Sequence, residues 1–203
     1  MEFQHAKCYA LQHDCRYDNV RPVLEAAGLL WVQRIEPGEL AGELQLHEQI
    51  HLSKDRQIAV RYVEDPFVEI AYLQIESDDA AQIVAFGRAL GEQLELFDLL
   101  DLEALGHADD LVSWSFAVRG MAALVRDHWG AARTAVEKGL LDARRDARRI
   151  ALRAIARLSW AELVPVLEQA VAREIDDSIR SEMETLIGGL RKHGKTPTGF
   201  IDW

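Results

Sequence analysis

The chain has few of the features that accompany export, membrane insertion or disulfide bonding. It has two cysteines, Cys8 and Cys15, which are too few for a disulfide framework and are expected to be free thiols. No stretch approaches the roughly 18 consecutive apolar residues of a membrane helix, and the first residues lack a basic region followed by an apolar one. We therefore expect a cytoplasmic protein with no membrane partner.

Common catalytic signatures are also missing. The sequence has no glycine-rich phosphate loop, no G-x-S-x-G turn around a nucleophilic serine and no Cys-x-x-Cys pair. We therefore expect neither an enzyme nor a bound cofactor, and we assign no catalytic residue.

Basic residues are scarce in the first half of the chain. Residues 1–110 hold 8 Lys+Arg against 22 Asp+Glu, a net charge of −14, whereas residues 111–203 hold 15 against 12, a net charge of +3. This asymmetry accompanies a division into two parts. An acidic chain is a poor general ligand for nucleic acid, because the phosphates repel it.

The first half does carry a strand-rich pattern. A strand is expected at 2–13 from its length and composition. Further strands are expected at 44–53 and 58–62, where apolar and polar residues alternate, and at 67–75, which is rich in β-branched and aromatic residues. A turn at 53–56 joins the second and third of them. The pattern predicts several antiparallel strands.

Two helical patterns interrupt these strands. The first has Asp18-Asn19 as its cap, Pro22 in its first turn and an end near Gly28, with helical spacing that includes Trp31. The second follows Ser77-Asp78-Asp79. A turn is expected at Pro37-Gly38.

The second half shows only helical patterns from Asp109 onward. Its tryptophans Trp114, Trp129 and Trp160 are expected to anchor helix packing. Helices are expected at 94–105, 109–126, 129–140, 142–158, 160–173 and 176–192, followed by an irregular tail.

The helical half contains an internal repeat. A shift of 31 positions places 118–140 on 149–171 without a gap, and a shift of 32 places 147–158 on 179–190, with matched arginine and apolar positions. Periods of this size are typical of stacked helix pairs, because a single pair cannot bury its own apolar face.

The repeat resembles a known family. Residues 146–158, DARRIALRAIARL, and 160–171, WAELVPVLEQAV, resemble HEAT-like repeats of the phycobilisome-lyase type, in which an acidic residue, a small or branched apolar residue and Arg open the first helix. Asp177-Ser178-Ile179-Arg180 repeats this opening, and Val118-Arg119 belongs to a degenerate copy. The resemblance implies a helical repeat stack over roughly 109–192. An ordinary helical bundle is the alternative.

The expected helix at 142–158 has two distinct faces. Its apolar seam consists of Ala147, Ile150, Ala151, Ala154 and Leu158. Beside the seam, residues four apart are neighbours and form an arginine ridge of Arg145, Arg149, Arg153 and Arg157. These cations repel one another, so an acidic group is expected to compensate them: the acidic first module, a protein partner or a phosphate. We assign the ridge as the candidate binding site, against the alternatives of a solvated face or an intramolecular contact.

His47-Glu48-Gln49-Ile50-His51 matches the zinc-peptidase pattern H-E-x-x-H. That chemistry needs a helix, which places both imidazoles one turn apart with the glutamate as general base. On a strand the two histidines would stand roughly 13 Å apart, too far to share one zinc ion. The surrounding alternation favours the strand, and a zinc hydrolase is kept as the least favoured function.

A second group of potential metal ligands lies at the start of the chain. His5, Cys8, His13 and Cys15 have a spacing that matches no familiar zinc site, and Cys8 would point away from His5 on a strand. We therefore assign them structural roles and expect no metal.

These patterns predict an α+β protein. An antiparallel-sheet module is expected at 1–106, an all-α HEAT-like helical repeat stack at 107–193, and an irregular tail at 194–203. The expected function is a non-enzymatic interaction protein, such as an adaptor, an inhibitor or an immunity-type binder, with a protein partner that is basic. The alternative is nucleic-acid binding through the arginine ridge, by analogy with HEAT-like DNA glycosylases.

Overall fold

The computed structural model describes residues 3–12, 15–35, 46–125 and 130–195. The chain forms two compact units, Met1–Asp98 and Leu99–Trp203. The first contains an antiparallel sheet and the second only helices apart from one isolated bridge, among the residues described. The α+β class and the order of its two parts are therefore confirmed. The sequence had suggested a boundary between residues 106 and 107.

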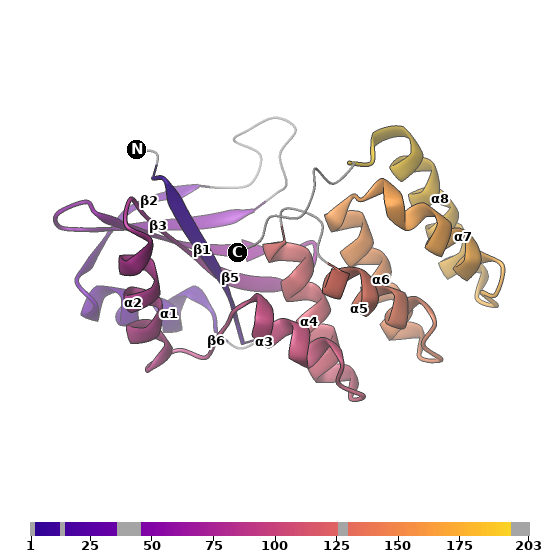
Figure 1. The fold of residues 1–203 in the computed structure, drawn as a ribbon, viewed down its shortest axis with the longest axis horizontal. Coiled ribbons are helices and arrows are strands. Elements are labelled where there is room, and N and C mark those ends of the chain that lie inside the picture. The colour runs from indigo at the N-terminus through magenta and orange to yellow at the C-terminus, as the bar shows by residue number, and fades with distance from the viewer. Residues whose placement is uncertain (1–2, 13–14, 36–45, 126–129, 196–203) are drawn as a thin grey trace. The chain divides into compact units, whose positions relative to one another are not determined.

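The first unit is a six-stranded sheet with two helices (Figure 1). Its strand order is β2-β3-β4-β5-β1-β6, and every neighbouring pair is antiparallel. The strands are β1 His5–Leu11, β2 Leu29–Ile35, β3 His47–Ser53, β4 Ile58–Asp65, β5 Ile70–Ser77 and β6 Leu96–Phe97, and the helices are α1 Tyr17–Ala26 and α2 Ala80–Gly91.

Both helices of this unit pack on the same face of the sheet. Alternation places every second residue of a strand on that face, and the register aligns Tyr9, Leu73 and Tyr62 across β1, β5 and β4. The apolar side chains of the helices complete one core. The core consists of Tyr9, Leu11, Val20, Leu24, Leu29, Val60, Tyr62, Leu73, Ile75, Ile83, Leu90 and Leu94.

The first helix begins earlier than the sequence indicated. The carbonyl of Arg16 accepts the first backbone bonds, so the helix starts at Tyr17, and Pro22 lies inside it rather than in its first turn. Gly28 has a positive φ of 84° and does follow the end of the helix. Trp31 was wrongly placed in the helical pattern, because the chain reverses at Gly28 and continues as β2.

The strands β3, β4 and β5 and the following helix α2 confirm the predicted pattern. Asp79 caps α2 by accepting the amide hydrogen of Ala81. The expected connecting helix over 94–105 was partly wrong: Leu96 and Phe97 pair with β1 as the edge strand β6, and the helix begins only at Leu99. The expected turn at Pro37-Gly38 lies outside the described residues.

The second unit is a two-layer stack of helices (Figure 1). One layer contains α3, α5 and α7 and the other α4, α6 and α8. Each helix contacts the next within its layer, and between the layers α3 packs on α4, α5 on α6 and α7 on α8. The helices are α3 Leu99–Gly106, α4 Leu111–Leu124, α5 Gly130–Leu140, α6 Arg145–Leu158, α7 Val164–Val171, which follows the short 3-10 helix η1 Ala161–Leu163, and α8 Asp177–His193.

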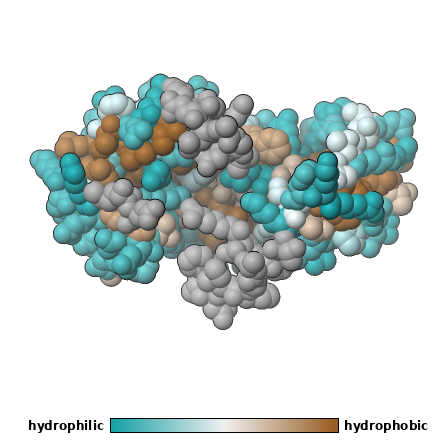
Figure 2. Space-filling view, turned by 90° about the horizontal axis from the view of Figure 1, so that it is seen from above, coloured by the Kyte–Doolittle hydropathy of each residue, from teal (hydrophilic) through white to brown (hydrophobic). Residues whose placement is uncertain are grey.

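The helix bounds recur at the spacings of the sequence matches. A shift of 31 carries α5 onto 161–171, which is η1 together with α7, and a shift of 32 carries the start of α6 onto the start of α8. Trp114 and Trp160 are buried, as expected of packing anchors, whereas Trp129 lies outside the described residues. Figure 2 shows that apolar surface, in brown, occurs on both units among more extensive polar surface.

Candidate interaction surface

The helix α6 positions the arginine ridge. This helix packs against α4 and α5, which precede it in the chain, and against α8, which follows it. The residues of α6 that face these helices are buried. The predicted seam is largely confirmed, although Ile150 is only partly buried and Leu152 and Ile155 are buried as well. The buried residues are Ala147, Ala151, Leu152, Ala154, Ile155 and Leu158.

The first two ridge arginines pair with carboxylates that precede or lie on α8. Arg145 Nε is 2.8 Å from Oδ2 of Asp176, and Arg149 Nη2 is 3.2 Å from Oε1 of Glu182. The side chains of these pairs retain between 27% and 51% of their exposure, so each pair contributes about 0–1 kcal/mol. The sequence had suggested the first module, a partner or phosphate as the compensating acid, and did not identify these two residues.

The other ridge arginines lie further along the same helix. Arg153 is exposed and Arg157 is half-buried. The four arginines therefore lie on one side of α6 and differ in exposure. The two nearer the start of the helix, Arg145 and Arg149, form a row of alternating charge with Asp176 and Glu182.

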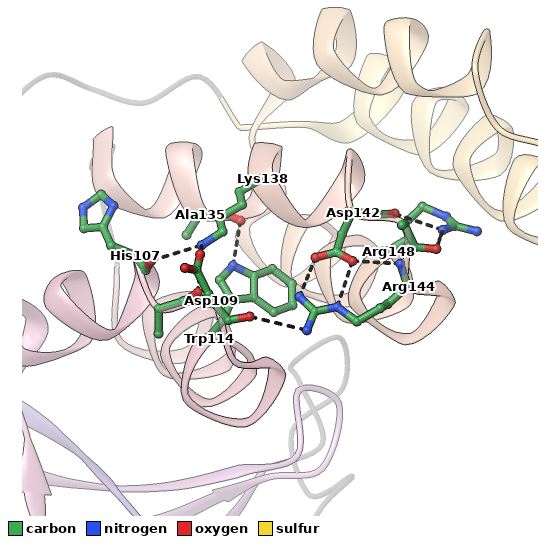
Figure 3. Close-up of polar contacts among 10 residues, drawn as sticks. His107, Asp109, Trp114, Ala135, Lys138, Asp142, Arg144 and Arg148 are labelled. Carbon is green, nitrogen blue, oxygen red and sulfur yellow. Dashed lines mark hydrogen bonds and ion pairs between the residues drawn. The ribbon is translucent and has the colours of Figure 1, made fainter.

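Basic side chains also donate hydrogen bonds to backbone carbonyls in the turns between helices (Figure 3). Arg148 Nη1 donates to the carbonyls of Asp142, at 3.0 Å, and Ala143, at 2.9 Å, and Lys138 Nζ donates to the carbonyls of His107, at 3.1 Å, and Ala108, at 2.7 Å. Helix termini leave backbone carbonyls without intrahelical partners. These cations satisfy such carbonyls at the turns after α3 and α5.

The turn after α7 repeats the turn after α5. The Asp142 carboxylate accepts the amide hydrogen of Arg144, and 32 residues later the Glu174 carboxylate accepts that of Asp176. Arg180 donates to the Glu174 carbonyl as Arg148 does to that of Asp142. The hydrogen bond from the Arg144 side chain lowers the pKa of Asp142 to about 2.

One ion pair between these repeated turns is buried. Arg148 Nε is 2.8 Å from Oε2 of Glu174, and their side chains are 13% and 2% exposed. Arg148 therefore bridges the carbonyls at the start of α6 and the carboxylate before α8. Removal of one partner from a buried ion pair strongly destabilises the fold, because the other charge stays buried without compensation.

The H-E-x-x-H residues lie on β3, as the alternation favoured. His47 pairs with Glu64 and His51 with Val60 of β4, so the two histidines are four residues apart on an extended strand. His51 is fully buried and its Nε2 is 3.2 Å from Tyr17 Oη, whereas His47 is half-buried. A strand cannot bring both imidazoles to one zinc ion.

His51 instead belongs to an aromatic contact between α1 and the sheet. The ring of Tyr17 lies 5.8 Å from that of His51 and 5.3 Å from that of Tyr62. Tyr62 Oη donates to Oε1 of Glu64 at 2.7 Å. Burial lowers the pKa of His51 and raises that of Tyr62, because the charged form of each side chain loses solvation.

The two cysteines lie in different elements, Cys8 on β1 and Cys15 in the segment before α1. Cys8 Sγ lies 3.8 Å from Oε1 of Gln74 on β5, and Cys15 packs at the edge of the core. Both are free thiols, as expected. The structure contains no cluster of three potential metal ligands within its described ranges, from which His13 is excluded.

A polar network that the sequence reasoning missed lies on the sheet face opposite the helices. Arg61 on β4 is 2.9 Å from Glu76 and 3.4 Å from Glu48, and Gln74 also donates to Glu76. The alternation of Arg61 with buried Val60 and Tyr62 was the available signal. The mutual pairing satisfies these charges, so the network stabilises the sheet.

The comparisons with known proteins give no family. No protein-family model, curated protein or solved structure matches the chain. Among the described residues, no helix is both long enough and apolar enough to cross a membrane.

Proposed function

We propose that the chain is a non-enzymatic interaction protein that binds a protein partner through the arginine ridge on α6. The observation that carries the proposal is the row of alternating charge at the surface, in which Arg145 and Arg149 meet Asp176 and Glu182. Such exposed pairs are individually weak. A partner with charged side chains can therefore replace them at little cost.

The type of helix stacking supports this proposal. Helix pairs that repeat every 31 or 32 residues fit a HEAT-like stack, whose extended surfaces suit macromolecular recognition. We propose that the partner is basic overall, because residues 1–98 hold 8 Lys+Arg against 18 Asp+Glu, and that it carries acidic side chains where it meets Arg145 and Arg149. Opposite charge accelerates encounter and favours the correct orientation. An inhibitor or immunity-type role is the specific form that we propose.

Nucleic-acid binding through the same ridge is the second candidate. The exposed Arg153 favours it, since a guanidinium can contact phosphate. The carboxylates of Asp176 and Glu182 beside the ridge oppose it, because they repel phosphate. We therefore place protein recognition first.

Affinity capture with chemical cross-linking in a lysate of the source organism tests the proposal. We expect the protein to capture a specific basic protein, and we expect Arg149→Glu with Arg153→Glu to reduce that capture at least tenfold. The matched control is Lys54→Glu with Arg88→Glu, which makes the same charge change at two exposed positions of the first unit. Circular dichroism of each variant checks that it is folded.

The outcomes separate the candidates. Equal loss of capture in both double variants would show that total charge, not the ridge, determines binding. Binding to duplex DNA that weakens steeply with salt and is lost only in the ridge variant would establish the second candidate. No specific partner at low salt in either assay would contradict both.

A further inference from the structure

The outermost strand of the sheet exposes an unusual amount of apolar surface. β2 is at one edge of the sheet, so among the described strands only β3 pairs with it. Three consecutive side chains, Leu30, Trp31 and Val32, remain 54%, 51% and 50% exposed. Edge strands present unpaired backbone groups, and proteins usually protect them with charges, proline or short length.

The protection of β2 is limited. The strand has seven residues and one charged side chain, Arg34, and it contains no proline. The register with β3 shifts between Trp31 and Gln33, which marks a bulge at Val32. A bulge twists the edge and interrupts regular pairing, but here Val32 itself and the two apolar residues before it remain exposed. Figure 2 shows apolar surface gathered on the first unit, at the left of the view.

We propose that β2 pairs antiparallel with β2 of a second copy of this chain. Two identical antiparallel strands are related by a two-fold axis, so the surface is complementary to itself. An axis beside Trp31 places Leu30 of each copy near Val32 of the other and the two Trp31 side chains near each other. Arg34 then lies near Gly28 and faces no like charge. Aromatic and β-branched neighbours stabilise such cross-strand contacts.

Charge selects this edge for self-association. Residues 1–98 carry a net charge of −10, with 8 Lys+Arg against 18 Asp+Glu, so most approaches of two copies oppose acidic surfaces. Residues 29–35 contain no acidic side chain. Pairing of β2 with β2 therefore opposes no carboxylates within residues 29–35. The small contact corresponds to a weak, reversible dimer, because stable interfaces usually bury about 800 Å² per partner.

The charge of the two units determines how salt affects the dimer. Two acidic units repel each other, and salt screens this repulsion while leaving the apolar contact intact. Dimer formation should therefore strengthen as salt rises. Addition of a basic peptide strand to the same edge would instead weaken with salt, which distinguishes the two occupants.

Sedimentation equilibrium of the full chain between about 1 and 100 µM tests the proposal. We expect a monomer–dimer equilibrium whose dissociation constant falls at least threefold from low to high salt. Val32→Lys should raise that constant at least tenfold, because it places two ammonium groups at the interface. The matched control is Val84→Lys on α2, where Val84 is 49% exposed; it should leave the constant unchanged.

A second variant tests the register. Trp31→Cys should give an oxidised disulfide dimer, since the two-fold axis brings residue 31 of both copies together, whereas Val84→Cys should not. A monomer at 100 µM in high salt would overturn the proposal. So would a dimer that Val32→Lys and Val84→Lys weaken equally, or one that salt dissociates.

Discussion

Gly139 is a point of close packing between three helices of the second unit. A β-carbon there would lie 2.4 Å from Cζ2 of Trp114 and 2.9 Å from the β-carbon of Ala151. Trp114 cannot easily yield, because it is buried and its Nε1 donates to the Ala135 carbonyl at 3.3 Å, as Figure 3 shows. The helices α4, α5 and α6 can therefore pack this closely only because residue 139 has no β-carbon.

We expect Gly139→Ala to lower the free energy of unfolding by about 1–3 kcal/mol, the usual cost of overpacking. The matched control is Gly188→Ala on α8, where a new β-carbon would contact nothing within 4 Å. That substitution should raise the free energy of unfolding by about 0.5–1 kcal/mol, because alanine favours a helix. Urea denaturation measures both, and a loss of stability in both variants would contradict the packing argument.

We expect His51 to make the first unit sensitive to mild acid. Its folded-state pKa is lowered by burial, so the folded state binds its proton less readily than the unfolded state does. The charged groups that act on it are Arg21 and Glu25 of α1, which pair with each other. The hydroxyl of Tyr17 lies within hydrogen-bond distance of its Nε2. As pH falls through the unfolded value of about 6.5, protons should favour unfolding.

We expect the free energy of unfolding to fall between pH 7.5 and 5.5 more in the natural chain than in His51→Gln. Glutamine cannot gain the proton, and its amide is a polar group of similar size that can hydrogen-bond to a hydroxyl. Denaturation followed at both pH values gives the difference. An identical pH dependence in the two proteins would show that His51 does not control this step.

At the scale of elements, the buried pair of Arg148 and Glu174 joins successive helix turns. We expect Glu174→Ala to lower the free energy of unfolding by about 2–4 kcal/mol, because it leaves a mostly buried guanidinium without its carboxylate. Asp177→Ala is the control, since Asp177 is 90% exposed and its pair with Arg180 is a surface pair worth less than about 1 kcal/mol. Equal losses by thermal denaturation would contradict the role of burial.

The elements that the sequence predicted correctly are those whose pattern is local. The alternation from His47 to Tyr62 and the helix start at Ser77-Asp78-Asp79 each depend on neighbouring residues, and the structure contains the predicted strands and helix there. β2 and β6 were missed for one reason. Their strand character comes from pairing with distant β3 and β1, which apolar spacing along one segment cannot reveal.

The candidate surface could be predicted only in part, for a similar reason. The spacing of the four arginines on α6 follows from helical geometry. Their partners Asp176 and Glu182 lie about one repeat away in the sequence, and only the stacking of α8 against α6 brings them near. Unlike helical position, this pairing depends on the arrangement of whole helices.

At the scale of the whole molecule, each unit has its own point of close packing. Gly139 meets Trp114 within the second unit, and in the first unit a β-carbon on Gly87 would lie 2.6 Å from Tyr9 Oη. Gly87→Ala should therefore loosen α2 from β1. Each substitution disturbs only contacts within its own unit.

We expect hydrogen exchange with mass spectrometry to localise the two effects, because local opening follows the contacts that are lost. Gly139→Ala should accelerate exchange in α4, α5 and α6 and leave β3, β4 and β5 unchanged. Gly87→Ala should do the reverse, accelerating exchange in α2 and β1, so each variant is the control for the other. Equal acceleration in both units by either substitution would mean that the chain opens as one cooperative whole.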